Sequence, residues 1–526
     1  MDRVLRNNFV AKLIAAFATA YQFSCAKRFV DWWKEIYSHS NTRRILRRYL
    51  LRPSTLVYSN YYRFLDKCNT LGAKLSEALR PAVDNSFFFR LWHTFKNSRV
   101  VSESVTKKAL EKLGSRGILI VCFTLYLPID WLLRDVLNLA SIASVWDELF
   151  LLGCVAYLFW RMLITKRERI RPRATPLDAP LFFFLAVAVF LMSVVSPNMG
   201  IAVSGWRAVC QHMLWFFVIV RLIEDEHDLN VFYYTFCGMC LVIALHGIFQ
   251  YIVGAEIPAH WVSKTEAGVR TRAFSIIGSP NIMGCLLVMA APTLASLAYD
   301  KEKPLWLKLC AWAGVMILCV ATLVTFSRGA WFGLAIAATL FVLLCDRKLV
   351  LFLLIGVAAV LLFVPEVANR ILYLFTPEFQ AATNAGGRAI RWATGLDLLH
   401  NHSNAFLGFG LGRFGGAIAM QNQVIEGLDY FYMDNYYLKT LVEMGYAGLS
   451  SYIILLFFTL LSSARTLFKR HKDALTIRGI GMLCGMIGVL AHCYFENIFE
   501  VPYMTAYFWA FAAVIMFLGF RRKKTP

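Results

Sequence analysis

The sequence has few charged residues, and acidic residues are the scarcer kind. Charged residues make up 17% of the 526 positions and hydrophobic residues 58%, with 33 Asp/Glu against 54 Lys/Arg. The mean hydropathy of +0.56 is far above what a water-soluble chain can accommodate in its core. The composition therefore excludes a soluble globular protein and indicates an integral membrane protein.

The cysteines form neither a disulfide framework nor a metal-binding pattern. None of the thirteen lies in the long polar segment 365–435, and the two with CxxC spacing, Cys237 and Cys240, lie inside an apolar run. The sequence also lacks a P-loop and an Asp-x-Asp motif, the signature of enzymes that hold a metal-bound nucleotide sugar. We therefore expect no bound metal and no cofactor.

Long apolar runs are what the sequence has in quantity. A membrane-spanning helix needs roughly 20 mostly apolar residues. Twelve stretches qualify: 117–133, 147–164, 178–195, 207–223, 229–253, 276–299, 305–326, 330–346, 348–364, 436–462, 479–497 and 503–520. We expect an all-α, polytopic integral membrane protein with about twelve transmembrane helices and a long external loop, 365–435, that contains short helices.

The net charge of +21 is concentrated before the first apolar run. Residues 1–117 hold 22 Lys/Arg and 8 Asp/Glu, and further basic clusters occupy 166–173 and 521–524. Basic segments remain on the cytoplasmic side by the positive-inside rule. We therefore predict a basic cytoplasmic or interfacial segment at 1–116, a transmembrane domain at 117–526, and both termini in the cytoplasm.

The basic N-terminal segment predicts contact with a membrane surface. The stretch NTRRILRRYLLRP, residues 41–53, mixes arginine with Ile and Leu, a pattern typical of an interfacial helix on anionic lipids. Residues 9–25 imitate a signal peptide, but export would carry the arginines outward against the charge rule. Nucleic acid is the rival partner, and a chain already committed to the membrane does not need it. We expect anionic lipids and no nucleic acid.

Three capped helix starts face outward when the spans are counted from a cytoplasmic N-terminus. Ser279 precedes Pro280 in GSPN, Ser327 begins SRGAW, and Asp434 or Asn435 begins DNYYL. Ser, Asp and Asn are preferred N-caps, and Pro suits the first helical position. Each helix would present free N–H groups and the positive end of its dipole to the outer leaflet, an arrangement that binds phosphate.

Arginines accompany two of these helix starts. Arg328 follows the cap in TFSRGAW, while Arg270 and Arg272 precede the other helix in GVRTRAF. A guanidinium group binds paired phosphate oxygens better than an ammonium group does, although a lone interfacial arginine is often only a snorkelling anchor. The convergence predicts an anion site, most simply for the diphosphate of a lipid in the outer leaflet.

The external loop adds a helix and a glycine-rich turn. We expect the helix from Arg388 to His400, followed by a turn with five glycines: Gly408, Gly410, Gly412, Gly415 and Gly416. The glycines either cradle a phosphate or a sugar, or simply form a tight, flexible loop. His400 and His402 are candidate bases, although polar loop histidines are mostly just solvated.

Four motifs, in a fixed order, resemble the O-antigen ligase and polymerase superfamily. They are RAFSIIGSPNIMG, TFSRGAW, GRAIRW with LGFGLGRFG, and DNYYLKTLVEMGYAGL, and the resemblance covers roughly residues 117–520. It implies an enzyme of the bacterial cytoplasmic (inner) membrane whose active site faces outward. Such enzymes transfer a glycan from an undecaprenyl-diphosphate-linked donor to an acceptor sugar hydroxyl. The diphosphate is already a good leaving group, so no metal is required.

The resemblance also implies roles for individual residues. Arg272 and Arg328 match arginines that grip the donor diphosphate, and Asp434 replaces the histidine that precedes the Asn-x-Tyr-Leu motif of the ligases. Either Asp434 is the base or the chain is polymerase-like, and we slightly favour polymerisation over ligation to lipid A core or another acceptor. The catalytic candidates are Asp434, Arg328 and Arg272. The substrate-binding candidates are Arg270, Ser279, Asn281, Ser327, Arg388, Arg391, Asn435, Tyr436 and Lys439.

Charged residues near the spans leave weaker candidates and one alternative function. Lys439 would lie one turn inside the membrane with Glu443 as its partner, and Glu496 and Glu500 lie at the outer end of the eleventh run. A flippase or transporter of lipid-linked glycans would also suit an outward cationic pocket. Transporters, however, usually carry ionisable residues near the membrane midplane and have repeated halves, and we find no internal repeat.

Overall fold

The chain is helical in this computed structural model, and the described residues contain no strand. The structure describes residues 59–84, 105–164, 173–256, 271–347, 349–378, 388–424, 432–469 and 473–520, with residue 381 and isolated positions before residue 57. Arg270, residues 166–172, residues 521–526 and nearly all of 41–53 lie outside them. The chain divides into two units, Met1–Thr55 and Leu56–Pro526, and every helix discussed below belongs to the second.

Nine helices in the described ranges are long and apolar enough to cross a membrane. They are α12 (Asp178–Val195), α13 to α14 (Met199–Leu222), α15 (Glu226–Val253), α16 with η7 (Pro280–Tyr299), α17 (Leu305–Leu323), α18 (Arg328–Cys345), α24 (Tyr436–Phe468), α25 (Ala474–His492) and α26 (Pro502–Phe520). The second of these begins well before the predicted residue 207, because Asn198 caps it by accepting a hydrogen bond from the Ile201 N–H. The other eight follow predicted runs closely.

Against the expected number of about twelve spans, two further predicted runs are not straight helices but bent pairs. Leu113–Thr124 of α8 (Val105–Thr124) meets Tyr126–Val136, which comprises α9 (Tyr126–Trp131) and η2, at 65°. α19 (Leu349–Phe363) meets Pro365–Phe375, which comprises α20 (Pro365–Leu372) and η8, at 92°. With each bent pair as one span, the described residues hold up to eleven.

The remaining predicted run is α11 (Trp146–Ile164), which is long enough to cross but more charged than the others. It contains Asp147, Glu148 and Arg161. α19 by itself is too short to cross a membrane. Its fifteen residues extend only about 22 Å at 1.5 Å per residue, which is less than the roughly 30 Å thickness of the hydrocarbon core. Window hydropathy records apolar content, and it does not record a bend.

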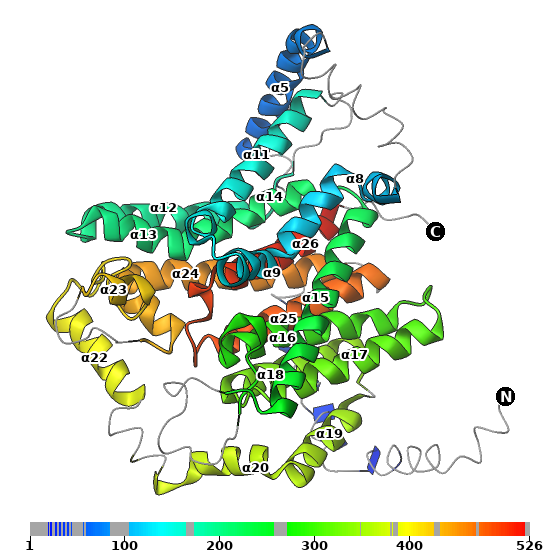
Figure 1. The fold of residues 1–526 in the computed structure, drawn as a ribbon, viewed down its shortest axis with the longest axis vertical. Helices are drawn as coiled ribbons and strands as arrows, with labels where there is room; N and C mark the ends of the chain where they lie inside the picture. The colour runs from blue at the N-terminus through cyan, green and yellow to red at the C-terminus, as the bar shows by residue number, and fades with distance from the viewer. Residues whose placement is uncertain are drawn as a thin grey trace. The chain divides into compact units, whose positions relative to one another are not determined.

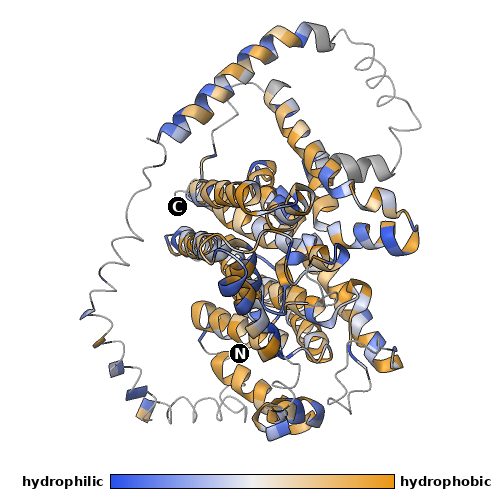
Figure 2. Cartoon of the chain, turned by 90° about the vertical axis from the view of Figure 1, so that its left-hand side faces the viewer, coloured by the Kyte–Doolittle hydropathy of each residue, from blue (hydrophilic) through white to orange (hydrophobic). Residues whose placement is uncertain are grey.

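The centre of the bundle is formed by α16, α25 and α26. In their apolar stretches 89%, 72% and 83% of the residues are buried, against 28% in both α17 and α18, which therefore leave most of their surface to lipid. The three central helices lie close together in Figure 1, and Figure 2 shows the apolar colour over most of the bundle. The start of α16 and the end of α25 thus belong to the most buried helices of the bundle.

Small residues bring α25 against α16. A Cβ atom on Gly481 would lie 2.4 Å from the carbonyl oxygen of Pro292, and one on Gly485 would lie 2.6 Å from that of Met289. The two glycines are four residues apart on one helix face, the spacing of the small-residue motif through which membrane helices approach closely. This contact fixes α16 beside α25 along the length of both helices.

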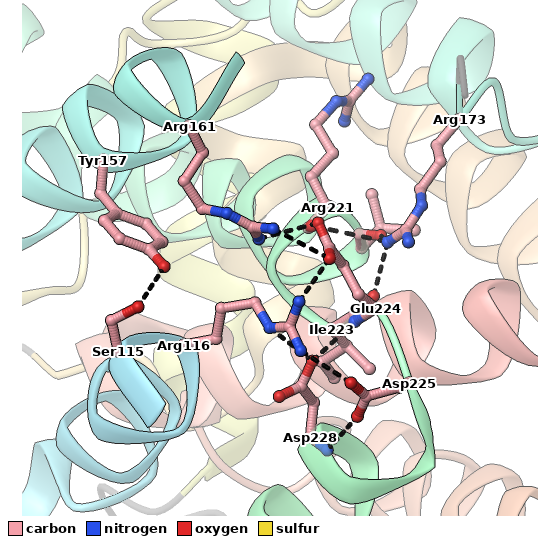
Figure 3. A network of polar contacts seen from close by, with 11 residues as sticks. Ser115, Arg116, Tyr157, Arg161, Arg173, Arg221, Ile223, Glu224, Asp225 and Asp228 are labelled. Atoms are coloured by element: carbon pink, nitrogen blue, oxygen red, sulfur yellow. Dashed lines mark hydrogen bonds and ion pairs between the residues drawn. The ribbon is translucent and has the colours of Figure 1, made fainter. Parts of the chain in front are cut away.

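One end of the bundle is tied together by ion pairs (Figure 3). Arg116 of α8 contacts Glu224, Asp225 (2.7 Å) and Asp228 (3.0 Å) at the junction of α14 and α15. Arg161 at the end of α11 contacts the same Glu224 at 2.8 Å. We call this set of five residues the ion-pair network.

Two further arginines have contacts at the same end of the bundle. Arg173, just before α12, donates to the carbonyl oxygen of Val220 at 2.7 Å. Arg478 near the start of α25 contacts Asp300, after η7, at 3.0 Å, and also Asn230 in the first turns of α15. The segments around residues 221–228, 299–304 and 473–478 therefore gather at one end of the bundle.

Candidate active site

The three predicted helix caps are confirmed. Ser279 caps α16, Ser327 caps α18 and Asn435 caps α24, and each side chain accepts a hydrogen bond from the backbone N–H three residues later, at 3.0–3.4 Å. Of the two alternatives at the third helix, Asn435 rather than Asp434 is the cap. The Asp434 carboxylate is therefore available for other contacts.

Arg272 is attached to the segment that leads into Arg328. It is only 8% exposed, and its Nε donates to the carbonyl oxygen of Thr325 at 2.9 Å. Its second contact, from Nη2 at 3.2 Å, is to the side-chain oxygen of Asn281 in the first turn of α16. Since Thr325 lies three residues before Arg328, the two arginines predicted to act together lie at the same end of the bundle.

The start of α18 also meets the end of α25. A Cβ atom on Gly329 would lie 2.5 Å from the ring of His492 and 3.1 Å from Cβ of Phe495. Arg388 reaches the same place from α22 (Arg388–Asn401), where its Nη2 donates to the carbonyl oxygen of Phe495 at 3.1 Å. The helix that bears Arg328 and the helix that bears Arg388 thus share one contact region.

Asp434 joins α22 to the start of α24. Its carboxylate accepts hydrogen bonds from Arg388, from Arg391 at 2.8 Å and from the indole N–H of Trp392 at 3.3 Å. The carboxylate is 8% exposed, while the two arginine side chains are 43% and 35% exposed. The guanidinium groups therefore remain accessible to a ligand although both contact a carboxylate.

Glu496, named from the sequence only as a weaker candidate, occupies a central position. It is buried between α25 and α26, where its carboxylate accepts from the Tyr432 hydroxyl at 2.9 Å and from the Asn281 side chain. Burial raises the pKa of the Glu496 carboxyl, while these hydrogen bonds act in the opposite direction. Through Asn281 it is connected to Arg272. No spacing signal in the sequence marks this connection, because it joins residues far apart in the chain.

Lys439 and Glu443 form the predicted ion pair, with Nζ 2.9 Å from the carboxylate and both side chains almost fully buried. Glu443 also accepts from the backbone N–H of Phe414 at 3.2 Å. Tyr436, predicted to bind substrate, packs its buried ring against Tyr452 and Phe499. The structure thus places Tyr436 in the core rather than beside the arginines.

The glycine-rich turn fits into a break in α24. The helix is interrupted at Gly445, whose φ is +65°, and the carbonyl oxygens of Val442 and Glu443 accept hydrogen bonds from the N–H groups of Phe409 and Gly410 at 2.8 and 2.9 Å. Gly408 has φ +91°, and a Cβ atom there would lie 2.4 Å from the nitrogen of Gly445. These contacts favour a tightly packed loop over a cradle for a phosphate or a sugar.

The histidines of the external loop lie at the other end of α22. His400 contacts the Leu396 carbonyl oxygen and the Tyr446 hydroxyl, and His402 lies 3.6 Å from Asp397. Arg388 and Arg391, which contact Asp434, begin the helix, so roughly 18 Å of helix separates His400 from Arg388. In the described part of the chain, no group of three or more His, Cys, Asp or Glu side chains is arranged to hold a metal ion.

The middle of the chain matches the model of a known protein family. Residues 313–453 match the family model described as O-antigen ligase. This part of the chain is an O-antigen ligase family domain. The match begins inside α17 and ends inside α24, so the O-antigen ligase domain contains Arg328, Arg388 and Asp434, while Arg272 and Glu496 lie on either side of it. No curated protein matches the chain significantly.

The family assignment gives the broad activity. The protein is a multi-pass membrane protein that contains an O-antigen ligase family domain at residues 313–453, and this family transfers glycans during polysaccharide and lipopolysaccharide biosynthesis. Its O-antigen ligase domain contributes two of the three capped helix starts, those of α18 and α24.

Proposed function

We propose that the protein transfers a glycan from an undecaprenyl-diphosphate-linked donor to a sugar hydroxyl of an acceptor, and releases undecaprenyl diphosphate. One observation supports the proposal: Arg272 contacts the first turn of α16, Arg328 is the first residue of α18, and the pair Arg388 and Arg391 contacts Asp434 just before α24. Guanidinium groups and helix N-termini are both suited to a diphosphate.

The reaction forms one glycosidic bond and breaks another. The acceptor oxygen attacks the anomeric carbon of the donor, the bond from that carbon to the diphosphate oxygen breaks, and the diphosphate leaves as an anion. Arg272 and Arg328 stabilise the negative charge that develops on the leaving group, since hydrogen-bonding groups that are already in position need no reorganisation during the reaction. The proton of the acceptor hydroxyl passes to a base, for which we propose Asp434.

Donor binding would prepare Asp434 for this role. In the structure, Arg388 and Arg391 both contact Oδ2 of Asp434. A diphosphate competes for the same two guanidinium groups through charge-assisted hydrogen bonds. As the arginines turn to the diphosphate, the Asp434 carboxylate loses two hydrogen bonds from guanidinium groups and becomes a better proton acceptor. The base would then be strongest when the donor is present.

We further propose that this site faces away from the cytoplasm. In the sequence, the basic stretch 166–173 lies between α11, which carries Arg161 of the ion-pair network, and α12, and the positive-inside rule assigns such a stretch to the cytoplasmic side. The starts of α16, α18 and α24 are at the opposite ends of their helices from Asp300 and Arg478. Undecaprenyl-linked glycans would thus be used at the outer leaflet.

The acceptor decides between polymerisation and ligation, and we favour polymerisation because aspartate replaces the histidine of the ligases. Purified protein would be incubated with a synthetic undecaprenyl diphosphate glycan, with and without a lipid A core acceptor. Lengthened lipid-linked chains without the added acceptor indicate a polymerase, and a product on the core indicates a ligase. Translocation of the donor across a bilayer with neither product would indicate a flippase and refute the proposal.

A further inference from the structure

α5 (Asn60–Asp84) lies against the transmembrane part of the protein at the end with the ion-pair network. A Cβ atom on Gly72 would lie 2.7 Å from Cε of Met162, the residue after Arg161 of the network. The ring of Tyr61 contacts that of Phe182 in the first turn of α12 at a centroid distance of 6.4 Å. One face of α5 is therefore covered by α11 and α12.

A second apolar face of α5 is exposed. Phe64, Leu71, Leu75 and Leu79 expose between 41% and 70% of their surface. Their spacings of seven and four residues put them on one stripe of the helix, and Figure 2 shows apolar and polar residues alternating along α5. We call these four residues the α5 stripe. A stripe of this kind on a soluble surface would be unusual, since large exposed apolar patches mark interaction sites.

A row of basic residues borders the α5 stripe. Arg63, Lys67 and Lys74 are exposed and lie along one edge of it, whereas Asp66 and Glu77 lie farther round the helix. Long basic side chains in this position lay their methylene groups along apolar neighbours and extend their charges to a polar layer. The combination of an apolar stripe with a basic border is typical of helices that lie in the headgroup region of a bilayer.

We infer that α5 binds the surface of an anionic phospholipid leaflet beside the ion-pair network, with its stripe below the headgroups and its basic row paired with lipid phosphates. Charge selects this occupant over a second copy of the chain, because a second α5 would bring an identical row of positive charges. The inference is independent of the proposed glycan transfer.

The test measures amide hydrogen exchange of residues 60–84 in the full-length protein. The protein would be placed singly in nanodiscs of phosphatidylcholine, alone or mixed with phosphatidylglycerol. Each basic residue near an anionic surface contributes about a factor of five in affinity, so exchange should be slower by about tenfold or more in the anionic discs. Equal exchange in the two lipids would overturn the inference.

Two variants and one control separate charge from packing. Arg63→Gln/Lys67→Gln/Lys74→Gln should abolish the dependence on lipid charge, whereas Arg80→Gln, an exposed position away from the stripe, should preserve it. Leu71→Ser/Leu75→Ser should raise exchange in both lipids. If exchange slows only when two copies share a disc, whatever the lipid, the stripe is an interface between copies and the inference is wrong.

Discussion

Arg272 and Arg328 belong to different parts of the chain. Arg272 is buried and has hydrogen bonds to a backbone carbonyl and to Asn281, so its guanidinium plane is fixed before any ligand arrives. Arg328 is the first residue of α18 and is half-buried. A fixed arginine contributes preorganised charge, and arginine also offers two parallel donors that lysine lacks.

Replacing either arginine should therefore reduce transfer more than it reduces folding. We expect Arg272→Ala and Arg328→Ala each to lower kcat by about 10²–10³-fold, the usual cost of one preorganised donor to a developing anion. Arg134→Ala is the matched control, because Arg134 is an arginine at the end of η2 whose partner is Asp130. Turnover of both site variants at the control's rate would remove the diphosphate clamp from the mechanism.

Asp434 has two possible duties that kinetics can separate. As a general base it accounts for about 10²–10⁴-fold in rate, so Asp434→Asn should lower kcat by that amount while the donor KM changes little. If the carboxylate only positions Arg388 and Arg391, the donor KM should rise and kcat should remain near the unmodified value. Turnover with lipid-linked donor, measured over a range of donor concentrations, distinguishes the two.

At the scale of single helices, the contact of α16 with α25 depends on the absence of side chains. Overfilling a tight contact costs about 1–3 kcal/mol, and a Cβ on Gly485 would meet the backbone of Met289 at 2.6 Å. Gly485→Leu should lower the thermal unfolding midpoint and the transfer rate together, since both Arg272 and Glu496 depend on these helices. Gly238→Leu, in α15 with no neighbouring atom within 4 Å of an added Cβ, should leave both unchanged.

The sequence predicted helix starts better than helix interruptions. Caps are local: Ser279, Ser327 and Asn435 each bond to a backbone group three residues away, so residue type and position were sufficient. The break at Gly445 depends on the loop residues Phe409 and Gly410, which no local pattern connects to α24. For the same reason Glu496 was undervalued, since Asn281 and Tyr432 reach it from distant segments.

At the scale of the whole molecule, contacts sort the polar residues into two groups at opposite ends of the helices. One group is the ion-pair network with Asp300 and Arg478, and the other contains Arg272, Asp434 and Glu496. The described residues hold nine to eleven candidate spans where about twelve were expected.

The sidedness is tested by labelling intact cells with a membrane-impermeant maleimide. Asn401→Cys, exposed at the end of α22, should react from outside, whereas Glu302→Cys, exposed between η7 and α17, should react only after the membrane is permeabilised. The unsubstituted protein gives the background from its native cysteines. Reaction of Glu302→Cys in intact cells, with protection of Asn401→Cys, would invert the topology and remove the outer-leaflet site.

The interruption of α24 has a consequence for how such chains diverge. Gly408 and Gly445 approach so closely that neither tolerates a side chain, and the segment around Gly408 supplies the donors that complete the broken helix. A lineage that repaired the helix at residue 445 would leave the N–H groups of Phe409 and Gly410 without acceptors. Substitutions at the two glycines should therefore be inherited jointly, and the length of the chain between Phe406 and Gly410 should resist insertion and deletion.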